Sequence, residues 1–133
     1  MKKILILLSM LFLSVSLYSQ QKEKFYEAVF AKDINGSRQV VLSDKTRVDI
    51  VTDTFAIEVD FADKWAESVG QSLYYGYVLD KKPGVLLVVN GKEDNNFINR
   101  LMVIAMKKDI TVWIMDYNTN KWKKVKQIYR YDY

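Results

Sequence analysis

Arg47-Val-Asp-Ile-Val-Thr-Asp-Thr-Phe-Ala-Ile-Glu-Val-Asp60 contains two short runs in which apolar and polar residues alternate, separated by Asp53-Thr54. Alternation of this kind predicts two strands, over 47–51 and 55–60. A loop of two residues between them predicts an antiparallel hairpin. The stretch therefore indicates that this part of the chain is a sheet with one buried and one polar side.

The polar side of the hairpin consists of acids. If Thr52 faces Phe55 across the loop, Asp49 lies directly opposite Glu58, and alternation places Asp60 on the same side. The other side is wholly apolar, so burial fixes this register: Val48, Ile50, Phe55, Ile57 and Val59. Facing carboxylates repel one another, and a bound cation or a lysine between them would relieve that repulsion. Mg²⁺, which favours carboxylate and phosphate oxygens, or Mn²⁺ is the expected ion. A solvent-facing polar side without a metal is the alternative.

A helix is expected to follow the hairpin, from Ala62 or Asp63 to about Tyr77. At 100° per residue a polar stripe forms along it, and Trp65, Ala66, Val69, Leu73 and Tyr77 form the arc expected to pack on the sheet. The stripe consists of Lys64, Ser68, Gln71 and Tyr75. Lys64 lies in the first turn, directly after the acidic strand, so its ammonium can reach back to the same acids. A solvated helix face is the alternative interpretation of this stripe.

The rest of the chain completes an α-β-β-β-α-β-α-β order followed by a tail. The expected helices lie at 21–33 and 95–106, the other strands at 39–42, 85–89 and 109–115, and a loop at Lys82-Pro83-Gly84. We therefore expect a single α/β domain over residues 20–133.

Residues 1–19 have the pattern of a signal peptide. Lys2 and Lys3 precede an uncharged run from Ile4 to Leu17, which is shorter than the roughly 20 apolar residues that span a bilayer. We expect cleavage after Ser19, secretion or transfer to the periplasm, and no membrane anchor afterwards. The chain has no cysteine, which excludes a lipid anchor on cysteine and any disulfide.

Composition narrows the possible chemistry. The chain has no histidine, which excludes histidine-dependent nucleophilic catalysis and histidine zinc sites. Removing residues 1–19 takes two of the 20 basic side chains and none of the 16 acidic ones, which leaves a net charge of +2. Such a small charge gives little support for nucleic-acid binding by itself. Hydrolysis would have to rely on carboxylates, lysine and a hard cation.

The order of these residues resembles the PD-(D/E)XK nuclease superfamily, in particular members with a Q-x-x-x-Y motif on the helix after the acidic strand. The resemblance covers roughly residues 23–115 and implies a restriction-endonuclease-like α-β-β-β-α-β core with an added helix, strand and tail. It implies Asp49 and Glu58 as catalytic metal ligands, with Asp60 as a further ligand. Gln71 and Tyr75 match the Q-x-x-x-Y pair that supports the nucleic-acid side, and Glu23 or Glu27 matches an upstream glutamate.

Two departures from that pattern bear on activity. Val48 stands where some members have proline, and Asp60 occupies the usual lysine position, two residues after Glu58. Some members carry the lysine on the neighbouring helix, where Lys64 lies here, so Lys64 is the expected residue that positions the attacking water. The expected function is an exported, metal-dependent nuclease acting on DNA more than RNA. An exported binding module with a degenerate nuclease fold and a purely structural envelope protein are the alternatives.

The tail, residues 118–133, interleaves cations with aromatic rings. Lysines and an arginine could follow phosphates while rings stack on bases: Lys121, Trp122, Lys123, Lys124, Lys126, Tyr129, Arg130, Tyr131 and Tyr133. An edge strand over 121–128, paired with 111–117 around Asn118-Thr-Asn120, is the alternative, since edge strands often carry lysines. The nucleic-acid contact and the edge strand are compatible with each other.

Overall fold

The structure of this chain, a computed structural model, describes residues 1–126. Its helices are α1 (Lys2–Asp33), α2 (Trp65–Leu79) and α3 (Asn95–Lys108), with 3-10 turns η1 (Ala62–Lys64) and η2 (Gly91–Asp94). Its strands are β1 (Ser37–Val41), β2 (Arg47–Val51), β3 (Phe55–Phe61), β4 (Lys82–Val89), β5 (Thr111–Asp116) and β6 (Trp122–Lys124). The predicted order of elements is confirmed.

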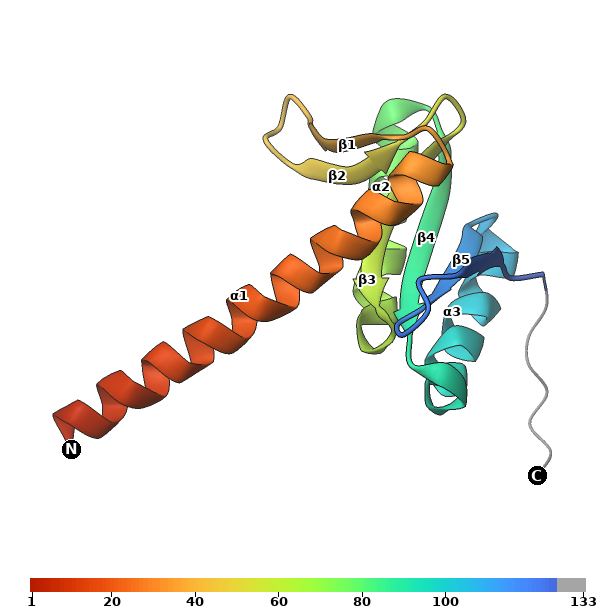
Figure 1. Cartoon of the computed structure of the whole chain (residues 1–133). Coiled ribbons are helices and arrows are strands. Elements are labelled where there is room, and N and C mark those ends of the chain that lie inside the picture. The colour runs from red at the N-terminus through yellow and green to blue at the C-terminus, as the bar shows by residue number, and fades with distance from the viewer. Residues whose placement is uncertain (127–133) are drawn as a thin grey trace.

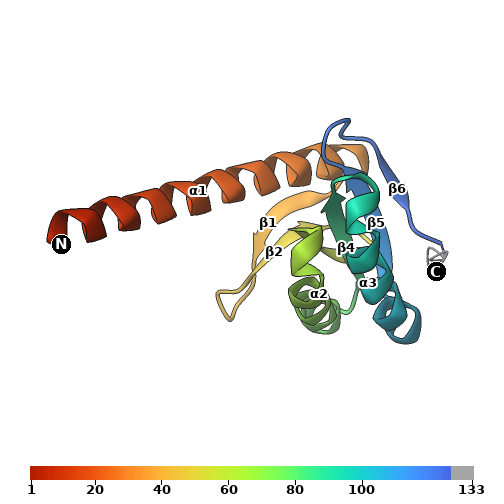
Figure 2. The same ribbon diagram turned by 90° about the horizontal axis from the view of Figure 1, so that it is seen from below.

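The six strands of the described residues form one mixed sheet in the order β1-β2-β3-β4-β5-β6. The central strands β3, β4 and β5 are parallel, and β1, β2 and β6 join them in antiparallel fashion. Figure 2 shows α1 over one face of the sheet and α2 and α3 over the other. The chain is therefore a single α/β domain in three layers, as its alternating strands and helices predict.

An apolar core fills the space on each side of the sheet. Under α1 the core contains Tyr26, Phe30, Ile50, Ile57, Val59, Leu86, Val88 and Met115. Under α2 and α3 it contains Val85, Leu87, Val89, Ile98, Leu101, Ala105, Val112 and Ile114. Successive residues of β4 alternate between the two cores, which is why this strand is a continuous apolar run in the sequence. Both faces of the central strands are thus buried, and any open site has to lie at an end or an edge of the sheet.

The hairpin has the predicted register. Ile50 pairs with Ile57 and Val51 with Ala56, and the Thr52 N–H donates to the Phe55 carbonyl at 2.9 Å. Beyond these two pairs β2 separates from β3, and the β1–β2 hairpin projects away from the central strands (Figure 1). We call the resulting opening the fork between β2 and β3. The N–H groups of β3 beyond Ile57 need other partners there, because unpaired buried donors are costly.

The buried side of α2 matches the prediction at Trp65, Val69 and Leu73, which pack against the core, and differs from it at two other positions. Ala66 is exposed and Tyr77 is 89% exposed, although both were expected to pack on the sheet. Ser68, Ser72, Tyr75 and Gly76 are buried instead. The helix is rolled toward its small residues because Gly76 lies against the backbone of Lys81 and Pro83. This roll turns the polar stripe of α2 toward the sheet.

The prediction of a loop at Lys82-Pro83-Gly84 is wrong, because these residues form the start of β4. They pair with Phe55, Ala56 and Ile57 of β3. Proline is tolerated at the beginning of a strand, where a missing N–H costs little. Position 84 requires glycine, since a Cβ there would lie 2.9 Å from both Ile57 Cγ1 and Trp113 Cζ3.

The two glycines of α2 provide a test of this packing. A Cβ at Gly76 would lie 3.0 Å from the Lys81 carbonyl oxygen, whereas a Cβ at Gly70 would meet nothing within 4 Å. Gly76→Ala is expected to lower the free energy of unfolding by about 1 kcal/mol, because overpacking outweighs the gain in helix propensity. Gly70→Ala is expected to raise it by about 0.8 kcal/mol. Urea denaturation of both variants checks these opposite signs, and equal shifts would contradict the close approach.

The N-terminal segment continues α1 without a break at Ser19. Large apolar side chains from Ile4 to Leu17 are exposed, and this end of α1 projects from the body of the domain (Figure 1). One helix of the described part, Ile4–Asp33, is long and apolar enough by length and composition to cross a membrane, a test that signal sequences also pass. Cleavage after Ser19 and export stay predictions.

The C-terminal part forms the expected edge strand. Trp122, Lys123 and Lys124 of β6 pair with Met115, Ile114 and Trp113 of β5. The intervening turn is closed by Asp116, whose N–H donates to the Lys121 carbonyl at 2.9 Å. The strand ends at Lys124, earlier than predicted. The tail residues expected to stack on bases, Tyr129, Tyr131 and Tyr133, and the cation Arg130, expected to contact phosphate, lie outside the described residues.

Candidate active site

Four acids meet at the fork between β2 and β3, and we call them the acid cluster: Glu23, Asp49, Glu58 and Asp60. Glu58 and Asp60 are buried on β3, 4% and 6% exposed, while Asp49 on β2 is half-buried. Glu23 comes from α1 on the other face of the sheet, and it reaches the same place because β2 has left the edge of β3. The predicted pair and its neighbour are therefore brought together, by three separate elements.

Asp49 and Glu58 occupy the positions that strand pairing leaves open. The Val59 N–H donates to Asp49 Oδ2 at 2.9 Å, and the Asp49 N–H donates to Glu58 Oε1 at 3.4 Å. Each carboxylate thus accepts a backbone N–H from the opposite strand, and both lie in the fork. These bonds replace the missing ladder and hold the two carboxylates in the fork.

Lys64 lies beside the other two acids. Its Nζ is 3.7 Å from Asp60 Oδ1 and 3.7 Å from Glu23 Oε2. Asp60 also accepts the Ser68 hydroxyl at 2.9 Å. The predicted reach of Lys64 back to the acidic strand is confirmed, and it is made to Asp60.

Burial and mutual repulsion shift the acid cluster toward its neutral form. The pKa of Glu58 is raised to about 9, first by burial and then by the Asp49 charge. Burial also raises the pKa of Asp49 to about 6 and that of Asp60 to about 6, against the hydrogen bonds each accepts. The pKa of Glu23 is raised to about 7 by burial and by Asp60. One ammonium does not compensate these four carboxyl groups.

The donor set of the acid cluster suits a hard divalent cation. Carboxylate oxygens are what Mg²⁺ and Mn²⁺ prefer, and a divalent charge would offset the repulsion that raises these pKa values. Within residues 1–126 no group of three or more acids stands in a ready metal-binding arrangement. Asp49 and Glu58 each accept a backbone N–H. The carboxylate oxygens of the acid cluster nevertheless fit the ion chemically.

The Q-x-x-x-Y pair lies on the stripe of α2 that faces the sheet. Tyr75 is buried, 6% exposed, and its pKa is raised by burial and then by the charge of Glu58. Gln71 is half-buried one turn earlier. Tyr75 therefore lies within electrostatic reach of the acid cluster and belongs to its surroundings.

Three residues that support Asp49 were not predicted in this role. Arg38 Nε donates to Glu27 Oε1 at 2.8 Å, and the Glu27 side chain is only 2% exposed. Gln39 donates through Nε2 to Glu27 Oε2 at 2.6 Å and to Asp49 Oδ1 at 3.3 Å. Glu27 was considered only through the resemblance. No periodic pattern marks these residues, because the contacts join α1, β1 and β2.

Gln39 has an unusual backbone conformation for a strand residue, with a φ of 54°. A left-handed conformation costs a residue with a side chain about 1 kcal/mol, and it persists where the surroundings require it. Here it places the Gln39 amide between Glu27 and Asp49. The strained backbone therefore serves to orient one member of the acid cluster.

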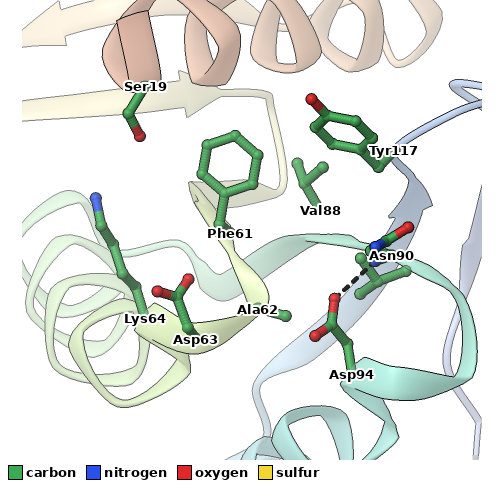
Figure 3. A pocket seen from close by; sticks show the side chains of 10 residues that line it. Ser19, Phe61, Ala62, Asp63, Lys64, Val88, Asn90, Asp94 and Tyr117 are labelled. Atoms are coloured by element: carbon green, nitrogen blue, oxygen red, sulfur yellow. Dashed lines mark hydrogen bonds between the residues drawn. The ribbon is translucent and has the colours of Figure 1, made fainter. Parts of the chain in front are cut away.

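A pocket of about 370 Å³ opens beside Lys64 at the carboxyl ends of β3 and β4 (Figure 3). Phe61, Val88 and Tyr117 line it, and Ser19 of α1 borders it. It does not include Asp49 or Glu58, so it adjoins the acid cluster only through Lys64. The cluster itself is the place where reactive groups converge.

The chain matches no protein-family model, and no solved structure matches it. It is similar to a KilA-N domain-containing protein of Acanthamoeba polyphaga mimivirus, with 28% identity over 111 residues. The match includes 81% of this chain and 30% of the viral protein. The chain thus spans less than a third of that relative.

Proposed function

We propose that this protein is a metal-dependent nuclease with a PD-(D/E)XK-like site that hydrolyses phosphodiester bonds, of DNA more than RNA, after export. One observation carries the proposal: Asp49 and Glu58, from neighbouring strands, converge at the fork, and Lys64 lies beside the adjoining acids Asp60 and Glu23. The restriction-endonuclease-like topology is part of the proposal. The α-β-β-β-α-β order and the parallel pairing of β3 with β4 support it.

Asp49 and Glu58 would hold the cation, with Asp60 as a further ligand. A divalent ion held there would lower the pKa of an attacking water and offset charge on the phosphate. Hydrogen bonds from the Val59 and Asp49 N–H groups fix the starting orientation of both carboxylates, and Gln39 fixes Asp49 from the other side. Such supporting contacts keep ligands in place as the cation enters.

Lys64 would act through its charge. Burial lowers its pKa, but the charges of Glu23, Asp60, Glu67 and Asp63 together outweigh burial and raise the pKa overall. The ammonium therefore stays protonated near neutral pH and cannot be a general base. It can donate hydrogen bonds to water or phosphate and stabilise the negative charge of the transition state. Such a role does not require the lysine to lie on β3, at the position of Asp60. A lysine just before α2, such as Lys64, can fill it.

The side chains of α2 would support the substrate. Tyr75 and Gln71 face the sheet next to the acid cluster, where they can position Glu58 and the nucleic-acid backbone. The pocket beside Lys64 leaves room for a substrate to approach.

The experiment that tests the proposal is incubation of the purified protein with plasmid DNA and with labelled DNA and RNA oligonucleotides. Mg²⁺, Mn²⁺ or EDTA is added in parallel. Cleavage with either ion and none with EDTA supports the nuclease. Binding of the oligonucleotides without cleavage under both ions would favour the binding module, which Asp60 in the usual lysine position suggests.

Lys64→Met is expected to reduce cleavage about 10²-fold, because it removes one charge that acts in the transition state. Metal affinity is expected to hold or rise, since the ammonium repels the cation. Single-turnover cleavage and Mn²⁺ titration measure the two quantities. Lys107→Met, on the exposed last turn of α3, is the control with the same loss of charge. Equal cleavage by both variants would contradict the role of Lys64.

A further inference from the structure

A second pocket, of about 390 Å³, lies on the α3 side of the sheet at the carboxyl ends of β4 and β5. Val89, Ile98 and Ile114 form its apolar floor, and Lys92, Lys121 and Lys123 stand around it. We call it the basic pocket. It combines apolar surface with three cations, which is a different chemistry from the acid cluster.

Cationic side chains outnumber anionic ones in the lining of the basic pocket, with Lys92, Lys121 and Lys123 against Asp116. Asp116 Oδ1 accepts the N–H groups of Asn118 and Thr119 at 3.0 and 2.8 Å. It also accepts the Thr119 hydroxyl at 3.0 Å. Asp116 is thereby bound into the turn before β6. Three lysines and this one engaged carboxylate line the pocket, a balance of charge that favours an anion.

The pocket lies at the beginning of α3, where Asn95 is the first helical residue and also lines it. α3 continues from η2, and an N–H at their junction donates to the Lys92 carbonyl, so α3 contributes through its dipole, which favours negative charge at this end. The field of α3 therefore acts in the same direction as the lysines. A bare phosphate would leave the apolar floor unused, whereas a nucleotide places its phosphate at the rim and its sugar and base over the floor.

The basic pocket adjoins the site proposed above. Val89, the last residue of β4, lines both the basic pocket and the pocket beside Lys64. Both open at the carboxyl end of the parallel strands, the edge at which α/β sheets commonly bind ligands. We infer that the basic pocket holds one nucleotide of the nucleic-acid strand that is cut at the acid cluster. The inference rests on the proposed function and adds a second, metal-independent binding site to it.

The test measures binding in EDTA, so that metal and cleavage do not enter. Fluorescence anisotropy with a labelled single-stranded DNA oligonucleotide gives the affinity of the full chain at several salt concentrations. Lys92→Gln combined with Lys121→Gln is expected to weaken binding about tenfold at low salt. It is also expected to reduce the slope of log affinity against log salt by about 1.4, since each lysine that neutralises a phosphate of a single strand adds about 0.7 to that slope.

The control is Lys107→Gln combined with Lys108→Gln, which removes the same charge at the exposed, opposite end of α3. The inference is supported if this control keeps the salt slope of the original protein while the slope of the pocket variant falls. Equal slopes in all three proteins would overturn it. If the nuclease proposal fails instead, the protein does not cleave with Mg²⁺ or Mn²⁺. Its salt-dependent binding in EDTA then still depends on the pocket lysines.

Discussion

Glu58→Gln is expected to reduce Mg²⁺- or Mn²⁺-dependent cleavage about 10³-fold, equivalent to ~4 kcal/mol in the transition state. Glutamine has nearly the same shape but offers a neutral oxygen, so the cation loses one of its two principal ligands. Single-turnover cleavage with saturating metal measures the loss.

The matched control is Asp53→Asn, an equivalent change from acid to amide at the exposed tip of the same hairpin. Asp53 is engaged through its backbone carbonyl, which accepts the Lys81 ammonium at 2.9 Å, so cleavage should stay within about twofold of the original protein. Activity of Glu58→Gln close to that of this control would contradict a metal held by Glu58. At subsaturating metal the loss should be larger, because the variant retains only Asp49 of the two principal ligands.

The hairpin shows what local sequence determines. A two-residue loop and a wholly apolar side allow one register, and the pairing of Ile50 with Ile57 confirms it. The same reasoning correctly places Lys64 near Asp60, because one turn of chain separates them. Both results depend on residues close in sequence, where geometry leaves few alternatives.

Helical periodicity was a weaker guide to α2. Hydrophobicity predicted that Tyr77 would be buried, yet the helix packs through Gly76 and Ser72, whose small side chains permit close approach to the sheet. Tertiary packing therefore outweighed the apolar count. The contacts of Gln39 with Glu27 and Asp49 were not predicted either, because they depend on where α1 crosses β1.

The metal-free protein is expected to become less stable as the pH rises from about 5 to 9, the reverse of the usual behaviour of carboxylates. The pKa of Glu58 is raised in the folded state from 4.5 to about 9. Below pH 4.5 it is protonated in both states and has no effect. Above that, the unfolded chain releases the proton while the folded protein retains it, so stability falls with pH until the folded group also ionises. Asp49, Asp60 and Glu23, all with raised pKa values, act in the same direction.

Glu58→Gln should remove most of this slope, since glutamine does not ionise. At pH 9 the metal-free variant is expected to be more stable than the original protein by about 3 kcal/mol, roughly 10 °C in Tm. Mg²⁺ should reverse the comparison, because it binds the deprotonated acids and its stabilisation grows with pH. Thermal unfolding of both proteins at pH 5, 7 and 9, with EDTA or Mg²⁺, measures these differences. A metal-free protein whose stability rises with pH would show that the buried acids are compensated by the chain itself, and a cation would then have no repulsion to relieve.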